Sequence, residues 1–268
     1  MKAIVVRQPW ATLIALGVKK IETRPAPPSG EMRPEGVRGL PGCSLVRGER
    51  IAIVAGAQRP KEPTVVGDYH VYNDNTSRSW LLDADETWSR PLPLGAVVCT
   101  VVVDDALPIV PCEPYDHPIT RRDGNCAARA DWLREWGGPR LRLGYIGTGG
   151  LDGGPWLVFG LGDSADASPM RDQLPLGDYE PGRWGWLLSD PQPPRAWCPG
   201  SGRRMAAHNS TPRYSCAVCG QRYLALAPGD ATAPDHRVPC DPIPCKGRQG
   251  VFELPADVAE ALSRGEAS

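Results

Sequence analysis

Residues 2–24, KAIVVRQPWATLIALGVKKIETR, predict two strands with a short helix between them. Residues 2–7 are rich in β-branched side chains, which is typical of a strand. Pro9 begins an amphipathic helix, because proline is favoured in the first helical turn, and Gly17 marks its end. The following KKIETR segment predicts a second, short strand.

Apolar runs elsewhere predict further strands. These are RIAIVAGA (50–57), GAVVCTVVVDDALPI (95–109), PWLVFGL (155–161), RWGWLLSD (183–190) and GVFELP. Helices are expected around Ser79–Trp88, around Cys126–Trp136 and in the terminal PADVAEALSRG. Residues 25–48 and 162–181 are expected to be loops, and so are residues 191–249 except for the cysteine knuckle and the run YLALA. Short strands with few, separated helices favour an α+β or mainly β fold, such as a small barrel, over a doubly wound sheet.

Composition narrows the function classes. The chain has 268 residues, of which 41% are hydrophobic, so it can bury a sizeable core. No stretch approaches the roughly 20 apolar residues that span a bilayer. The start lacks an apolar signal region, so we expect a cytoplasmic protein that does not bind membranes. The net charge of −1 excludes a uniformly basic surface. The charge is nevertheless uneven, because residues 1–60 carry ten Lys/Arg and four Asp/Glu, whereas residues 61–120 carry three Lys/Arg and ten Asp/Glu.

The nine cysteines fall into two groups. Four are scattered singly through the first part of the chain, and Cys99, inside an apolar run, is expected to be a small buried hydrophobe. The other five lie within residues 198–245. An odd count without a signal peptide argues against a disulfide framework.

The clustered cysteines predict a structural zinc site. The CAVCG knuckle of Cys216 and Cys219 brings two thiolates to one ion, and Cys198 and His236 complete a closed tetrahedral set. Cys240 is an alternative to His236, and His208 is a weaker substitute. The competing interpretations are a redox CxxC pair and an unmetallated loop. The redox pair is disfavoured because no βαβ pattern surrounds the knuckle. A site with four protein ligands has no open position for catalysis.

The N-terminal motif resembles that of a known family. The stretch RQPWA (7–11), followed by GVKKIETR (17–24), resembles the signature of the ASCH (activating-signal-cointegrator homology) domain of the PUA-like superfamily. Gly17, Lys19, Glu22 and Arg24 match its G-x-K-x-x-E-x-R pattern. The resemblance implies a PUA-like β-barrel with flanking helices.

The resemblance also implies a division of the chain. Residues 1–195 would form the ASCH domain with loop insertions, and 241–268 a strand and helix that complete it. In relatives the two parts are nearly contiguous. Residues 196–240, which contain most of the cysteine cluster, are therefore interpreted as a zinc-ribbon insertion.

The charged motif residues suit an anion. Residues two apart on a strand share a face, so Glu22 and Arg24 are expected to lie on the same side, with Lys19 reaching them from the preceding turn. Arg24 offers a planar fork for phosphate, and Lys19 a point charge. A structural Glu22–Arg24 ion pair is the alternative.

The family resemblance implies that the ligand is RNA, modified DNA or a modified nucleoside. Some relatives are amidohydrolases that deacetylate N4-acetylcytidine, and others are linked to ribonuclease activity. In the amidohydrolase pattern a Thr follows the Lys by three residues; here that spacing is met by Lys20 and Thr23, one residue out of register. If the chain is an enzyme, Lys19 or Lys20 would activate the nucleophile with help from Glu22.

Aromatic and basic residues leave two further choices open. Trp184 and Trp186 alternate on one predicted strand and either stack a base or fill the core. Arginines around the knuckle either contact phosphates or keep a small domain soluble. Three functions follow: a nucleic-acid-binding module, a hydrolase of modified nucleosides or nucleic acid, and a factor that binds a protein partner through the zinc segment.

Overall fold

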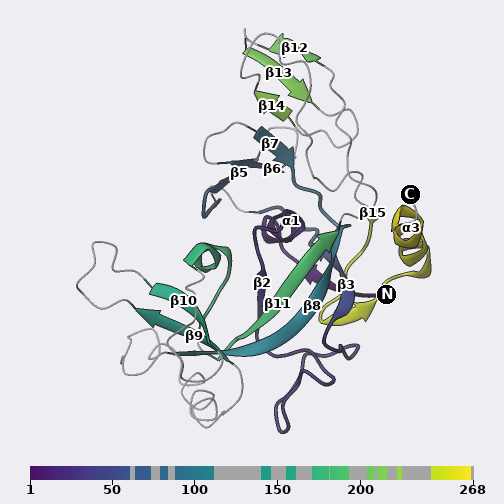
Figure 1. Cartoon of the computed structure of the whole chain (residues 1–268). Helices are drawn as coiled ribbons and strands as arrows, with labels where there is room; N and C mark the ends of the chain where they lie inside the picture. The colour runs from purple at the N-terminus through teal and green to yellow at the C-terminus, as the bar shows by residue number, and fades with distance from the viewer. Residues whose placement is uncertain are drawn as a thin grey trace. The chain divides into compact units, whose positions relative to one another are not determined.

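The computed structural model describes the following residues: 1–60, 64–73, 79–83, 88–111, 140–145, 155–160, 171–180, 182–192, 204–208, 211–215, 222–224 and 243–266. The described elements are mostly strands, as Figure 1 shows. Few helices accompany them, and those are α1 (Trp10–Ala15), the 3-10 helix η2 (Arg171–Leu176) and α3 (Ala256–Glu266). The expected mainly β fold class is confirmed at this level.

The chain divides into two compact units that interleave along the sequence. The first unit contains Met1–Lys19, Arg50–Val102 and Asp190–Ser268, and the second contains Lys20–Glu49 and Val103–Ser189. Three of the four boundaries fall inside strands, namely β3 (Glu49–Ala55), β8 (Ala96–Pro111) and β11 (Trp184–Gln192), and the fourth lies between Lys19 and Lys20. Neither unit is therefore a continuous piece of sequence.

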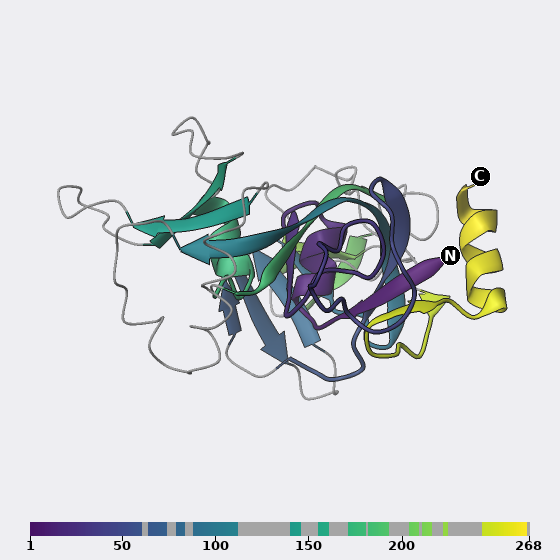
Figure 2. The same cartoon turned by 90° about the horizontal axis from the view of Figure 1, so that it is seen from below.

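A buried sheet forms the core of the first unit. Strand β1 (Lys2–Val6) pairs in parallel with β3 and antiparallel with β16 (Val251–Glu253). The first part of β8 pairs with β15 (Ile243–Pro244). Helix α3 covers this core with Val258 and Leu262. Figure 2 shows α3 beside the chain's N-terminus, where the Met1 amino group lies 3.4 Å from a carboxylate oxygen of Glu253.

A second sheet of the first unit is antiparallel throughout. Its strand order is β12-β13-β14-β7-β6-β5-β4. The seven strands are β4 (Thr64–Val66), β5 (Tyr69–Asn73), β6 (Ser79–Asp83), β7 (Trp88–Pro91), β12 (Arg204–His208), β13 (Thr211–Ser215) and β14 (Arg222–Leu224). Strands β12, β13 and β14 thus join a sheet that begins, in the sequence, with strands β4 to β7.

This sheet corrects two predictions. The short helix expected around Ser79–Trp88 is wrong, because β6 and β7 occupy its ends. Trp80 lies opposite Tyr72 on β5, and Leu81 lies opposite Val71. Apolar residues therefore occupy both faces of β6, which hides the alternation typical of a strand. The loop expected over most of 191–249 is wrong where β12, β13 and β15 lie.

The second unit is built on β2 (Ile21–Arg24) and its partner β11, which pair antiparallel. A hairpin of β9 (Arg140–Tyr145) and β10 (Pro155–Gly160) lies next to the second part of β8, which pairs with β9 in parallel. The unit's apolar cluster consists of Ile21, Leu107, Ile109, Leu141 and Tyr179. Strand β2 is thus anchored at its first residue.

The strands expected at 2–7, 50–57, 95–109, 155–161 and 183–190 are confirmed with small shifts at their ends. The two terminal predictions, a strand in GVFELP and a helix after it, are confirmed by β16 and α3. The helix expected around Cys126–Trp136 lies outside the described residues.

Candidate functional site

The segment that opens the motif is fixed by buried polar contacts in the first unit. The Gln8 side chain is buried, and its Oε1 accepts a hydrogen bond of 3.1 Å from the backbone N–H of Thr12. Its Nε2 donates a 2.8 Å bond to the carbonyl of Pro93. Gly17 follows the helix with φ of +72°, a conformation that favours glycine. The predicted end of the helix near Gly17 is confirmed.

Lys19 and Lys20 have opposite exposures. Lys19 ends the first unit with only 2% of its surface exposed, and its backbone N–H donates a 3.0 Å bond to the carbonyl of Leu13. Lys20 opens the second unit with an exposed side chain. Its backbone N–H donates a 2.8 Å bond to Oε1 of the fully buried Gln173. A buried lysine is uncommon, so the exposures favour Lys19 as the more specialised of the two.

Glu22 and Arg24 form an ion pair on one face of β2. The Nε atom of Arg24 lies 3.0 Å from Oε1 of Glu22, and the side chains are 19% and 10% exposed. The expectation that these two residues share a strand face is confirmed. The pair is partly removed from water, so its mutual attraction is stronger than that of a surface pair.

Two tryptophans of β11 lie directly opposite the ion pair in the strand register. Trp184 is opposite Arg24, and Trp186 is opposite Glu22. Both are buried, and the Nε1 atom of Trp186 donates a 3.3 Å hydrogen bond to the carbonyl of Ala26. Burial agrees with the core-packing alternative for both indoles. Directly opposite residues of an antiparallel pair lie on the same face of the sheet, so both indoles lie beside the charged pair on that face.

Arg183 adds a second cation to this part of the second unit. Its Nη1 lies 3.1 Å from Oδ2 of Asp178, and its Nη2 donates a 3.4 Å bond to the carbonyl of Thr23. The backbone N–H of Asp178 donates to Oγ1 of Thr23 at 3.3 Å. Sequence reasoning missed Arg183, Asp178 and Gln173, because they lie about 150 residues beyond β2 and form no motif with it.

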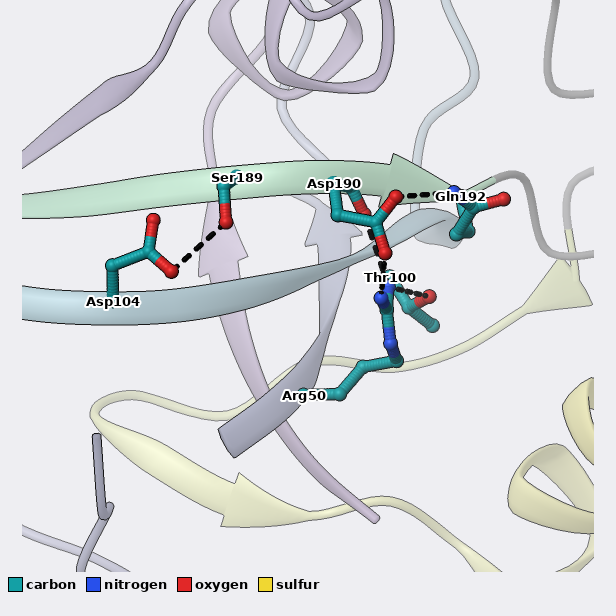
Figure 3. A network of polar contacts seen from close by, with 6 residues as sticks. All are labelled: Arg50, Thr100, Asp104, Ser189, Asp190 and Gln192. Carbon is teal, nitrogen blue, oxygen red and sulfur yellow. Dashed lines mark hydrogen bonds and ion pairs between the residues drawn. The ribbon is translucent and has the colours of Figure 1, made fainter. Parts of the chain in front are cut away.

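A separate polar network lies at the end of β11, within the first unit. Arg50 forms an ion pair with the carboxylate of Asp190 and also donates to the Asp190 carbonyl at 3.0 Å (Figure 3). Thr100 accepts a 3.2 Å bond from Arg50, and Gln192 donates a 2.6 Å bond to Asp190. The pKa of Asp190 is lowered most by its hydrogen bond from Gln192 and next by its hydrogen bond from Arg50.

Asp190 has a left-handed backbone, with φ of +45°. Few residues other than glycine adopt this region, and Asp is among those that tolerate it. Within the second unit, Ser189 donates a 2.9 Å bond to Asp104, also drawn in Figure 3. These contacts link the three strands on which the residues lie, β3, β8 and β11, and nothing in them resembles a catalytic arrangement.

The predicted zinc ligands Cys198, Cys216, Cys219 and His236, and the alternative Cys240, lie outside the described residues. His208, the weaker substitute, falls on β12. Among the residues that the structure describes, no group of three or more His, Cys, Asp or Glu is placed to hold a metal ion. The zinc site therefore stays a prediction.

Two described cysteines are buried in the first unit. Burial raises the pKa of Cys99 far above its ordinary value, and the nearby charge of Arg50 lowers it slightly. Burial also raises the pKa of Cys245, with a smaller contribution from the Asp257 carboxylate. The expectation that Cys99 is a small buried hydrophobe is confirmed.

Comparison with protein-family models gives no match, and a search of curated proteins gives none either. In the described part of the chain, no helix combines the length and apolarity needed to cross a lipid bilayer.

Proposed function

We propose that the chain is a nucleic-acid-binding module of the ASCH type, with a PUA-like β-barrel and flanking helices, and that residues 19–24 recognise RNA or a modified nucleic acid. The observation that carries this proposal is the Glu22–Arg24 ion pair, partly buried on β2 on the same face of the sheet as Trp184 and Trp186. It lies in the motif on which the family resemblance rests.

The ion pair is better explained by recognition than by stability. A buried ion pair contributes little net stability, because desolvation of the two charges offsets their attraction. A carboxylate beside a guanidinium orients the planar fork, and such a fork binds phosphate or a base edge with two parallel hydrogen bonds. Glu22 adds an acceptor that suits an amino group of a base.

The experiment is a fluorescence-anisotropy titration with labelled 12-nucleotide RNA and DNA strands, unmodified or carrying N4-acetylcytidine. We expect Arg24→Ala to weaken binding to the preferred strand at least tenfold, and Arg24→Lys to restore only part of it. Arg38→Ala, at an exposed position of the same unit, removes the same charge and serves as the control. Equal affinities of Arg24→Ala and Arg38→Ala for every strand would refute the proposal.

Glu22→Gln separates the two partners of the pair. It keeps the shape of the side chain and removes the charge that repels phosphate. We expect it to leave overall affinity similar or tighter while it reduces discrimination between bases. A uniform loss of affinity across all strands would show that Glu22 acts only by holding Arg24.

The burial of Lys19 favours a hydrolase of modified nucleosides as the second candidate function. A lysine 2% exposed is desolvated, which is how enzymes activate a lysine amine. The test is a mass-spectrometric turnover assay with modified nucleosides and short RNAs. Product from the wild type but not from Lys19→Ala would establish an amidohydrolase or nuclease, and the exposed Lys20→Ala variant is the control. Binding without any product would leave the module non-catalytic.

We also propose that residues 196–240 form the zinc-ribbon insertion, with the third candidate function, binding of a protein partner, residing there. The antiparallel pairing of β12 with β13, and of β13 with β14, supports a ribbon-like segment. Deletion of this segment would remove a partner, but not nucleic-acid contacts, if protein binding is its role.

A further inference from the structure

Four exposed cations follow or flank the strands at one edge of the first unit's core sheet. Strands β1 and β3 are parallel, so their carboxyl ends meet at the same edge, with Val6 in register with Ala55. The backbone N–H of Gly56 donates a 2.8 Å bond to the carbonyl of Val6. Arg7 therefore leaves β1 beside the segment that leads from β3 to Arg59.

A C-terminal loop is held against the same edge. The backbone N–H of Cys245 donates a 2.8 Å bond to the carbonyl of Gly95, whose own N–H donates a 3.1 Å bond to the carbonyl of Ala55. A Cβ atom at Gly247 would lie only 2.1 Å from Cγ2 of Val5. The loop thus approaches β1 so closely that only glycine fits, and Lys246 and Arg248 flank the point of contact.

The edge is basic in a chain that is neutral overall. Arg7, Arg59, Lys246 and Arg248 are all exposed. Residues 3–8, 52–60, 92–99 and 243–250, which make up the edge, contain no Asp or Glu. One carboxylate, that of Asp257 on α3, lies near enough to Cys245 to act on its thiol. Cations gathered without acids among them attract a polyanion.

We propose that Arg7, Arg59, Lys246 and Arg248, named here the basic edge, bind the phosphate backbone of a nucleic-acid strand. The ligand class rests on the proposed function, whereas the surface is distinct from the residues 19–24 assigned there. We expect the basic edge to read no base, because contacts of Lys and Arg with phosphate oxygens carry no sequence information. It contributes affinity, and the motif contributes selectivity.

The test measures how binding of a labelled 20-nucleotide RNA changes with salt. Each phosphate contact to a single strand contributes about 0.7 to the slope of log affinity against log salt concentration. We expect Lys246→Ser/Arg248→Ser and Arg7→Ser/Arg59→Ser each to lower the slope by about 1.4. The control Arg38→Ser/Arg264→Ser removes the same charge from two exposed positions elsewhere and should leave the slope nearly unchanged.

Asp257→Asn is the complementary variant. Removing this carboxylate makes the edge more positive, so we expect tighter binding without a change in the preferred base. Circular dichroism and the thermal midpoint confirm that each variant folds, since all the altered side chains are exposed. Slopes of both edge variants equal to that of the control would overturn the proposal.

Other outcomes separate this proposal from the proposed function. If the edge variants weaken binding and Arg24→Ala does not, the motif assignment fails and the basic edge stands. If the wild type binds neither RNA nor DNA, the proposed function fails, and inorganic polyphosphate is then used as the probe. Weaker polyphosphate binding by the edge variants alone would support the basic edge as an anion-binding surface. Equal polyphosphate binding by all variants would overturn the basic edge. Poly-glutamate of equal charge that binds as tightly as RNA would overturn nucleic acid as the ligand.

Discussion

Gly185 is the position at which the packing behind the ion pair can be tested most directly. It lies on β11 opposite Thr23, between the register positions of Glu22 and Arg24. A Cβ atom there would lie 2.4 Å from Cδ1 of Leu141 and 3.0 Å from Cγ2 of Ile21. Carbon atoms pack best at roughly 3.5–4.0 Å, so Leu141 would have to retreat by about 1 Å.

The expected cost follows from how little room the neighbours have. Leu141 and Ile21 are fully buried, so neither can swing into solvent. Inserting a methyl group into such a core typically costs about 1–3 kcal/mol, and we expect Gly185→Ala to fall in that range. Gly56→Ala is the control, because its Cβ would meet neighbours at 3.7 Å, an ordinary contact. We expect that variant to change stability by less than about 0.5 kcal/mol.

A double-mutant cycle isolates the clash. Leu141→Ala alone leaves a cavity and should cost about 2–5 kcal/mol. Because it removes the Cδ1 atom that the new methyl group would strike, Gly185→Ala should cost at least about 1 kcal/mol less in that background. The free energies of unfolding come from urea titrations followed by tryptophan fluorescence. Costs that add within about 0.5 kcal/mol would refute the clash, as would a Gly185→Ala variant as stable as Gly56→Ala.

Three further predictions concern ionisation and metal. Because the pKa of Asp190 is lowered in the folded protein, its carboxylate stabilises the fold above the ordinary pKa of 3.8, and this stabilisation is lost as the pH falls through the lower folded pKa. The thermal midpoints of the wild type and of Asp190→Asn should therefore differ at neutral pH and converge in acid. A difference that stays constant with pH would contradict this prediction. Burial and the raised pKa of Cys99 predict that iodoacetamide labels it far more slowly than Cys43 in the native protein, with equal rates in urea, as peptide mass spectrometry would show. The knuckle predicts about one zinc ion per chain and lower thermal stability after chelation, and elemental analysis finding no metal, or no loss in Cys216→Ser, would contradict it.

The parts of the fold that sequence predicted are those in which one local signal dominates. The run AVVCTVVV became part of β8 because it is apolar at nearly every position, as a strand buried on both faces requires. The helix at Trp10–Ala15 followed from Pro9 before it and Gly17 after it. These signals need no knowledge of distant contacts.

The parts that were missed depend on partners far along the chain. Tyr223 of β14 lies opposite Trp88 of β7, and nothing near either residue announces that pairing. The same holds for Gln173, whose amide oxygen receives the backbone N–H of Lys20. Short strands such as β13 gain their hydrogen bonds only from partner strands, so their local sequence is weakly constrained and resembles a loop.

The motif stands out physically once burial is known. Seven polar or charged residues are buried in the described part of the chain, and four of them, Gln8, Thr12, Lys19 and Glu22, fall within the short stretch that the sequence singled out. Burying such groups costs free energy unless each is satisfied, so chance packing would disperse them and favour apolar residues in their place. A stretch that retains buried polar residues departs from the pattern expected if stability alone determined the sequence, and such departures concentrate at functional sites. The burial of these four residues thus supports, without reference to any resemblance, the proposal that this stretch serves a ligand as well as the fold.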